Sequence, residues 1–319
     1  MKNLAIFILF FSFTISAQNY SKVDQMVKNY PLNFNNIDEL ANRINSDFNI
    51  DEEKIRALYS WLSLNIKYDS SNDIFDINDY RITYYNLSDK KRQLKRRKIN
   101  RLEKKLKTKK AACIDYSEIF KEVCDRIGIL SEVVIGYSKT TINDIENDKS
   151  YKNHAWNAVK INGNWQLIDI TWASVAKNEI FSEFYDYYYF TKPEEFILTH
   201  YPIDSKWQLL RTKVSKIAFF KSPLFYTKYF IDEFKMSSFQ KGIIEINRKR
   251  LEVYFDSIPR NKKLFYRLDG DTYITPLNFK KTKNGNYVTS IKYKNNENSS
   301  LYIYSDFLPV LAFKIKSSL

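Results

Sequence analysis

Three residue types that together support nucleophilic chemistry occur in order between residues 110 and 172. Cys113 stands at the predicted start of an amphipathic helix, His154 opens a predicted β-hairpin, and Asp169 lies on the returning strand. A thiol with a pKa of about 8.5 is mostly protonated at neutral pH, so a nucleophilic cysteine needs help to ionise. A helix N-terminus and a neighbouring imidazolium both favour the thiolate. The pattern is therefore compatible with a Cys-His-Asp triad.

The predicted hairpin gives this hypothesis a geometry. The Asn-Gly pair at 162–163 is typical of a two-residue turn between strands His154–Ile161 and Asn164–Trp172. In that register His154 faces Thr171, and Asp169 is its diagonal neighbour on the same face. Diagonal pairs lie about 7–8 Å apart at the backbone, within reach of a carboxylate and an imidazole. A slip of one residue would move Asp169 to the opposite face.

Two other interpretations of these residues remain open at this stage. Cys, His and Asp side chains also bind metals, but one thiolate without a second cysteine nearby makes a poor structural zinc site. A buried histidine beside an inert thiol is the plainer alternative. The chain has only two histidines, His154 and His200, so few arrangements can be considered. Residue spacing alone does not decide between an active and an inert site.

The two cysteines are predicted to be free thiols. Cys113 and Cys124 are expected on one helix, where a rise of about 1.5 Å per residue separates them by about 16 Å. A disulfide requires Cα atoms within about 7 Å. Cys124 falls within the apolar stripe of that helix and is expected to be a small buried hydrophobe.

The N-terminus predicts export. Lys2 precedes a short apolar run, Leu4–Ile15, and the small residues Ser16 and Ala17 follow, as in a secretory signal peptide covering residues 1–17. The run is too short for a membrane span of about 20 residues, and no cysteine stands at the expected cleavage site for a lipid anchor. We therefore expect a secreted or periplasmic protein with no transmembrane helix.

The formal net charge of +14 is concentrated in one segment. Residues 90–110 hold thirteen Lys and Arg side chains against the single acid Glu103. Specific nucleic-acid binding is not expected, because the rest of the chain is nearly balanced. Three roles for Lys90–Lys110 stay open: a solvated helix face, attraction to an acidic surface or polymer, or a flap that shields the site.

The remaining pattern predicts an α+β fold in two parts. Helices are expected after the N-cap Asn36 and from about Asp51, ahead of a basic helical insertion at about 88–110. The helix that begins near Cys113 and stops at Gly128 should pack on an antiparallel sheet. This core is predicted to span residues 18–211. Short strands separated by turns predict an all-β sandwich-like domain over 212–319.

Several segments resemble the transglutaminase-like superfamily, whose members have a papain-like Cys-His-Asp core. The resemblance rests on three blocks in order: Ala112–Ser117 (ACIDYS), Asn153–Asn157 (NHAWN) and Trp165–Trp172 (WQLIDITW). Later segments resemble more narrowly the kyphoscoliosis peptidase branch: Tyr189–Pro193, Thr199–Pro202 and Trp207–Leu210. The segment Asn65–Asp69 also resembles a recurring part of the superfamily, with no role assigned.

The resemblance implies that Cys113 is the nucleophile, His154 the base and Asp169 the orienting acid. It implies a cysteine enzyme that acts on protein or peptide amide bonds through an acyl-enzyme, as a peptidase, deamidase or transglutaminase, without cofactor or metal. Asp115 departs from the small residue expected there and would oppose ionisation of the thiol. His200 is expected to have a structural hydrogen-bonding role. The alternative function is a catalytically silent binding or scaffold protein at the cell surface.

Overall fold

The computed structural model describes residues 20–69, 83–148, 151–179, 186–238, 240–293 and 300–316. The predicted signal peptide over residues 1–17 lies outside these ranges. Within them, no helix combines the length and the apolar character that crossing a bilayer requires.

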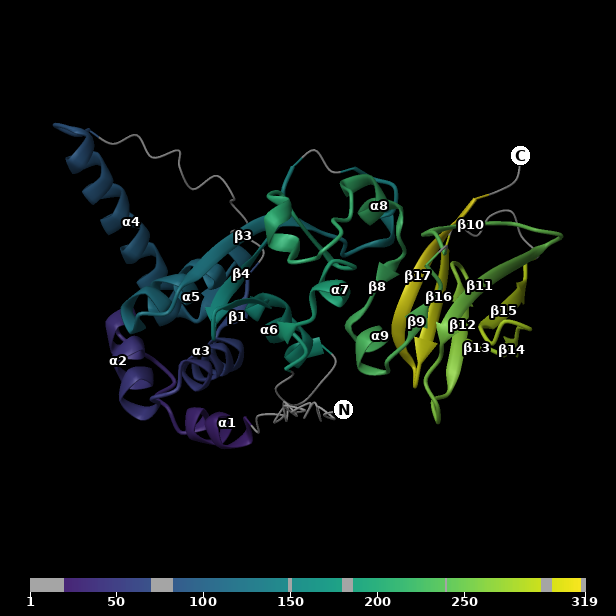
Figure 1. Cartoon of the computed structure of the whole chain (residues 1–319), viewed down its shortest axis with the longest axis horizontal. Coiled ribbons are helices and arrows are strands. Elements are labelled where there is room, and N and C mark those ends of the chain that lie inside the picture. Colours follow the sequence, from purple (N-terminus) through teal and green to yellow (C-terminus); the bar gives the residue numbers. More distant parts are fainter. Residues whose placement is uncertain are drawn as a thin grey trace, which may run out of the picture.

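The first part of the chain is a mixed α/β core in which helices surround one antiparallel sheet (Figure 1). Its helices are α1 Ser21–Lys28, α2 Ile37–Asp47, α3 Asp51–Asn65, α4 Leu87–Thr108, α5 Cys113–Ile127, α6 Ile170–Glu179 and α7 Pro193–Phe196. The sheet has the strand order β6-β5-β4-β3-β7, formed by Tyr189–Thr191, Asn164–Ile168, His154–Ile161, Ser131–Ser138 and His200–Pro202.

The predicted helix boundaries are confirmed where capping chemistry sets them. The Asn36 side chain accepts a hydrogen bond from the Glu39 backbone N–H at 2.8 Å and begins α2. Gly128 ends α5 with φ of 77°, a left-handed conformation that glycine adopts without a Cβ clash. Helix α5 lies against β3 and β4, so the predicted packing of this helix on an antiparallel sheet is confirmed.

The predicted hairpin register is confirmed, but the returning strand is shorter than expected. Ile161 pairs with Asn164 and Asn157 pairs with Ile168, as the Asn-Gly turn requires. Strand β5 then ends at Ile168 rather than at Trp172. Asp169 begins helix α6 instead, because one of its carboxylate oxygens accepts a hydrogen bond from the Trp172 backbone N–H at 3.0 Å.

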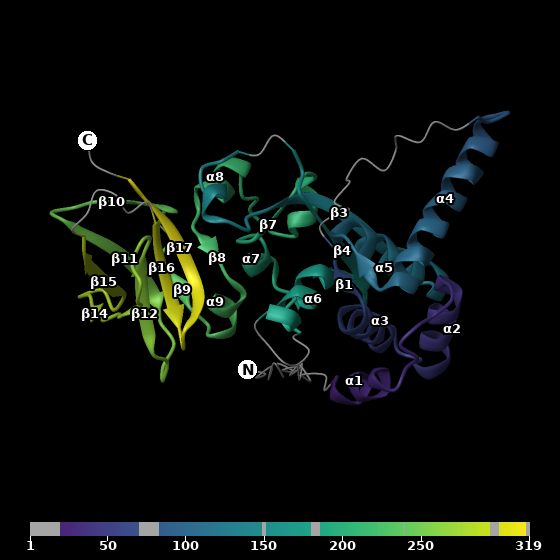
Figure 2. The ribbon, with the colours of Figure 1, turned by 180° about the vertical axis from the view of Figure 1, so that it is seen from behind.

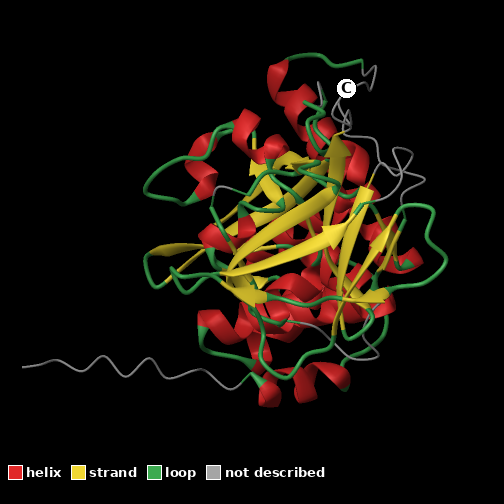
Figure 3. Ribbon diagram, turned by 90° about the vertical axis from the view of Figure 1, so that its right-hand side faces the viewer, coloured by secondary structure: helices red, strands yellow, loops and turns green. Residues whose placement is uncertain are grey.

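The C-terminal part is β-rich and contains two sheets, which Figure 2 shows from behind and Figure 3 from their own side. One sheet has the order β10-β17-β16-β12-β13 and also includes β8; these strands are Ile243–Glu245, Leu308–Lys316, Ser300–Ser305, Leu264–Leu268, Thr275–Pro276 and Leu224–Phe225. The other has the order β14-β15-β11-β9, formed by Lys280–Lys281, Tyr287–Lys292, Arg250–Ser257 and Lys235–Met236.

Side chains from both of these sheets share one apolar core, which includes Val253, Phe255, Leu301 and Phe313. The predicted sandwich-like arrangement is therefore confirmed. Strands β16 and β17 are separated by a short turn, in which Asp306 and Phe307 have positive φ values.

Two short helices, α8 Lys216–Lys221 and α9 Thr227–Ile231, lie within residues 212–319, so this part is not all-β as predicted. Helix α9 contributes Tyr229 and Phe230 to the C-terminal apolar core. Lys139, which is almost completely buried after β3, donates hydrogen bonds to the carbonyl oxygens of Phe219 at 2.8 Å, Ser222 at 3.0 Å and Pro223 at 2.8 Å. Burial lowers the pKa of this ammonium to about 7. The predicted domain boundary at residue 211 stays a prediction.

Candidate active site

The candidate nucleophile stands at the beginning of α5. Cys113 is the first residue of the helix, where backbone N–H groups lack intrahelical partners and favour negative charge. Its side chain packs with Ile114 and with Ala155, the residue that follows His154. Cys124 lies in the core, and burial raises the pKa of its thiol well above the usual range. Both cysteines are free, as predicted, and only Cys113 lies beside a histidine.

The histidine and the acid come from the two strands of the hairpin. His154 is the first residue of β4, and Asp169 follows the last residue of β5. The Nε2 atom of His154 lies 2.6 Å from Oδ2 of Asp169, and both side chains are buried. This contact leaves Nδ1 of His154 for the Cys113 side.

The protonation of His154 is set by opposing effects. Burial alone would lower its pKa, but the charge of Asp169, their hydrogen bond and the Cys113 side chain together raise the pKa of His154 to about 10. Burial would raise the pKa of Asp169, but the charge of His154 and the hydrogen bonds from both histidines hold it well below its usual range. The geometry therefore favours an imidazolium beside an ionised carboxylate.

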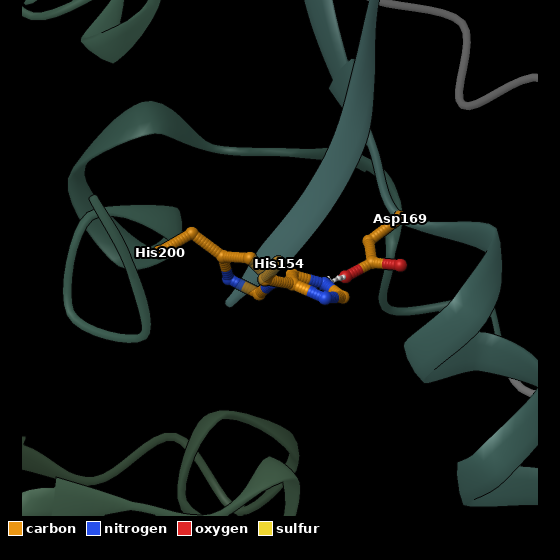
Figure 4. A group of neighbouring side chains, drawn as sticks. All are labelled: His154, Asp169 and His200. Carbon is orange, nitrogen blue, oxygen red and sulfur yellow. Dashed lines mark hydrogen bonds and ion pairs between the residues drawn. The ribbon is translucent and has the colours of Figure 1, made fainter. Parts of the chain in front are cut away.

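A second histidine completes the cluster. The Nε2 atom of His200 lies 2.9 Å from the same Oδ2 of Asp169, and its Nδ1 lies 2.7 Å from the Thr199 hydroxyl. Figure 4 shows His154, Asp169 and His200 converging from three separate segments. Burial lowers the pKa of His200 to about 4, and the charge of His154 adds to this effect. Neutral His200 thus donates from Nε2 to Asp169 when Nδ1 accepts from Thr199.

Aromatic side chains surround the two imidazoles. Phe196 stacks on His200 with ring centroids 4.1 Å apart, and Trp172 lies 4.5 Å from His200 and 5.8 Å from His154. Gly136 on β3 permits this packing, because a Cβ there would collide with the Tyr201 carbonyl oxygen and with the ring of Trp156. This apolar surrounding strengthens the electrostatic interactions of the buried polar cluster.

The three residues His154, Asp169 and His200 could in principle bind a metal ion, since their ligand atoms lie within 4.8 Å of one another. However, both imidazole nitrogens are already within hydrogen-bonding distance of Oδ2, at 2.6 and 2.9 Å. Zinc ligands at about 2.0–2.1 Å from a metal must lie farther from one another than this. The arrangement therefore fits direct hydrogen bonds better than metal coordination.

Asp115, which departs from the expected pattern, is compensated by the basic helix α4. Its carboxylate forms an ion pair with Arg101 and another with Lys105 at 3.3 Å, and it accepts a hydrogen bond from the Ala112 backbone N–H at 3.1 Å. The opposition to thiol ionisation expected from Asp115 is therefore reduced by two neighbouring cations.

The segment Asn65–Asp69, whose role the sequence did not reveal, anchors the entrance to the nucleophile helix. The carbonyl oxygen of Ile66 accepts hydrogen bonds from the Tyr116 hydroxyl at 2.6 Å and from the Ser174 hydroxyl at 2.8 Å. Strand β1, Lys67–Tyr68, pairs in parallel with β2, Lys110–Ala111, directly before Cys113. The segment Asn65–Asp69 therefore holds the chain that leads into the nucleophile helix. The sequence alone did not indicate this role, because β1 and β2 are far apart along the chain.

A family model of the transglutaminase-like superfamily matches residues 38–170, which include all three triad positions. The chain carries a transglutaminase-like domain. It is 27% identical to human kyphoscoliosis peptidase over 234 residues, which cover 71% of this chain and 32% of that protein. It is 29% identical to hillarin of Drosophila melanogaster over 37% of this chain and 17% of hillarin.

Similarity extends to cytokinesis protein 3 of Saccharomyces cerevisiae, which is 25% identical over 51% of this chain and 19% of that protein. The chain therefore spans about a third or less of the length of these relatives. Their names include a peptidase and a cytokinesis protein, so proteins of different description are similar to this chain.

Proposed function

We propose that this chain is a cysteine enzyme that acts on amide bonds of proteins or peptides through an acyl-enzyme. The observation that carries the proposal is the pairing of His154 with Asp169 at 2.6 Å, with Cys113 as the next neighbour of the imidazole. Nucleophile, base and orienting acid then have the roles of a triad. The transglutaminase-like domain over residues 38–170 supports the same reaction class.

In the proposed mechanism, the thiol proton of Cys113 is held on Nδ1 of His154, so that thiolate and imidazolium form an ion pair, and Asp169 stabilises this imidazolium. The thiolate attacks the amide carbonyl carbon and forms a carbon–sulfur bond. The carbon–nitrogen bond breaks, and the amine leaves with the proton from Nδ1. Water or a second amine then attacks the thioester, gives a proton to Nδ1 and releases the thiolate.

The acceptor in the second step defines the product. Water gives peptidase or deamidase activity, and an amine gives transglutaminase activity. The backbone N–H of Cys113, at the first position of α5, is the proposed donor to the oxyanion. His200 is proposed as a positioning residue, because it bonds to Asp169, the acid that orients His154.

The test is covalent trapping of the acyl-enzyme. The wild-type chain is incubated with a peptide library, and modified protein is identified by mass spectrometry, with Cys113→Ala as the blank. We expect an adduct on Cys113 of the wild type and none on the blank. Failure to trap any adduct, together with alkylation of Cys113 by iodoacetamide no faster than a free thiol, would refute the enzymatic proposal.

The second candidate function is that of a catalytically silent binding or scaffold protein at the cell surface. Burial of Cys113, which is 1% exposed, favours this alternative because a substrate carbonyl must reach the thiol. Similarity to cytokinesis protein 3 is compatible with it. The alkylation measurement distinguishes the two, since a scaffold requires no activated thiol.

We also propose that the chain is secreted or periplasmic, on the basis of the apolar run Leu4–Ile15 and the small residues after it. Mass spectrometry of the protein from its native cells tests this proposal. A mature N-terminus near residue 18 in the exported fraction is expected, and an intact N-terminus in the cytoplasm would contradict export.

A further inference from the structure

A basic groove separates α4 from α5 on the outside of the transglutaminase-like domain. The volume of this cavity is about 770 Å³. Six cations and three acids line it together with Leu94. In Figures 1 and 2, α4 runs alongside α5 near one end and extends away from the body of the molecule at the other.

The acids of the groove already have cationic partners. Glu122 pairs with Lys98 at 2.5 Å and with Arg126 at 2.9 Å. Glu118 pairs with Arg101, and Asp125 pairs with Lys121, which lies one turn earlier on α5, at 3.0 Å. The acidic charge of the lining is therefore locally compensated.

Two of the cations that line the groove have no acidic partner among the described residues. Lys91 and Lys95 are exposed, lie one helical turn apart, and form no ion pair with any residue that the structure describes. The exposed Arg96, Lys104 and Lys107 extend the positive charge along the rest of α4. Charge complementarity therefore predicts an anionic ligand for this groove.

The shape of the groove favours a narrow chain over a flat surface. A lipid bilayer cannot enter a cleft between two helices. Helix α4 also lacks an apolar face for insertion, because Leu102 and Leu106 are buried and, of its leucines, only Leu87 at the first position is strongly exposed. An extended polypeptide with Asp or Glu side chains can enter and pair with Lys91 and Lys95.

The groove also has a direction relative to the candidate nucleophile. Arg101, at its inner end, pairs with Asp115, which stands two residues after Cys113 in the first turn of α5. We propose that the groove between α4 and α5 binds an acidic segment of the protein substrate and so brings a neighbouring amide bond toward Cys113. This inference names a substrate class and rests on the proposed enzymatic function.

The first experiment measures binding without requiring catalysis. A fluorescein-labelled alternating Glu–Gly peptide is titrated against the full chain carrying Cys113→Ala, and fluorescence anisotropy is recorded at increasing NaCl. We expect saturable binding that weakens with salt. The double substitution Lys91→Glu/Lys95→Glu should weaken the affinity about tenfold or more, given two lost and reversed charge pairs.

The matched control is Lys280→Glu/Lys281→Glu, which reverses two exposed lysines on β14 of the C-terminal region. Affinity should be unchanged in this control. Equal losses in both double variants, or no loss in the groove variant, would overturn the proposal. Tighter binding of single-stranded DNA or of anionic phosphatidylserine vesicles than of the acidic peptide would also overturn it. The double variant Lys91→Gln/Lys95→Gln removes the two charges without reversing them. A melting temperature equal to that of the parent chain shows that its loss of affinity does not come from misfolding.

The second experiment tests whether binding of an acidic tract in the groove assists the reaction at Cys113. An acidic tract added to a peptide that forms the acyl-enzyme should lower KM several-fold with little change in kcat, and Lys91→Glu/Lys95→Glu should remove this gain. An equal KM with and without the tract would contradict substrate docking. If no peptide forms an acyl-enzyme while the acidic peptide still binds, the enzymatic proposal fails and the groove is an acidic-peptide site only.

Discussion

Two parts of this molecule each bury a carboxylate, and the partners of each carboxylate differ. In the transglutaminase-like domain, Asp169 is bonded to the imidazoles of His154 and His200. In the C-terminal region, Asp232 is bonded to the ammonium of Lys228 and to the Ser305 hydroxyl, each at 2.5 Å. An imidazole has two ring nitrogens, so His154 can bond to Asp169 through one and exchange a proton with Cys113 through the other, whereas an ammonium offers only N–H donors. Burial of charge alone therefore does not mark a reactive site.

The largest expected effect is a difference in reactivity between the two thiols of the chain, Cys113 and Cys124. Cys113→Ala should abolish acyl-enzyme formation, and His154→Ala should slow alkylation of Cys113 near neutral pH by about 10²–10⁴-fold, since the imidazole then no longer takes the proton. Mass spectrometry of iodoacetamide-treated protein gives the rates. Cys124→Ala is the control and should leave the alkylation of Cys113 unchanged, because Cys124 lies in the apolar core.

The two buried carboxylates give a matched pair of substitutions. Asp232→Asn should lower the free energy of unfolding by about 3–5 kcal/mol, because Lys228 is left buried without its counter-charge. Asp169→Asn should cost less stability, because His154 can release its proton, yet it should reduce thiol reactivity about a hundredfold. Urea unfolding and alkylation rates measure both quantities. Similar changes from both substitutions would remove the distinction between the two regions.

A pH series tests the neutral state of His200. Its folded pKa of about 4 lies below the ordinary value of about 6.5, so in this interval the unfolded chain binds a proton that the folded chain does not. Stability should therefore fall by up to a few kcal/mol as the pH decreases from about 6.5 to 4. His200→Gln should show a shallower loss over this interval. An unchanged slope of unfolding free energy against pH would contradict a neutral, buried His200.

The smallest expected effect concerns the cations that compensate Asp115. Arg101→Ala leaves the carboxylate with Lys105 as its remaining ion-pair partner among the described residues, and Cys113 should then be alkylated several-fold more slowly. Adding Asp115→Asn should restore the rate, since the uncompensated charge is removed. Arg92→Ala, which breaks an ion pair with Asp89 elsewhere on α4, is the control. An equal effect of the Arg92 and Arg101 substitutions would contradict this account.

Much of the fold was predictable because local rules determine it. Asn36, Gly128 and the Asn-Gly turn at 162–163 each fix the backbone within a few residues, and the structure confirms all three. The end of β5 was mispredicted, because strand alternation continues through Trp172 in the sequence while the side chain of Asp169 caps a helix there. A capping aspartate after an apolar run was the signal that could have revealed this.

The candidate site was predictable in residue types but not in its connections. Cys113, His154 and Asp169 stood out by type and order, and the hydrogen-bonding role expected for His200 has a defined partner, Asp169. Ion pairing between Asp115 and Arg101 could not be foreseen, since neither spacing nor periodicity relates α4 to α5 in space. Long-range contacts of this kind depend on how helices pack, which a single sequence does not encode locally.

The two carboxylate oxygens of Asp169 have different hydrogen-bond partners, and this difference has an evolutionary consequence. Oδ1 accepts the hydrogen bond from the Trp172 backbone N–H that caps helix α6, and Oδ2 is hydrogen-bonded to both His154 and His200. Asparagine begins helices as well as aspartate does, but it carries no charge to sustain an imidazolium. A lineage could therefore lose the chemistry at this position by one substitution and keep the shape, so that enzymes and non-enzymes could diverge within one architecture.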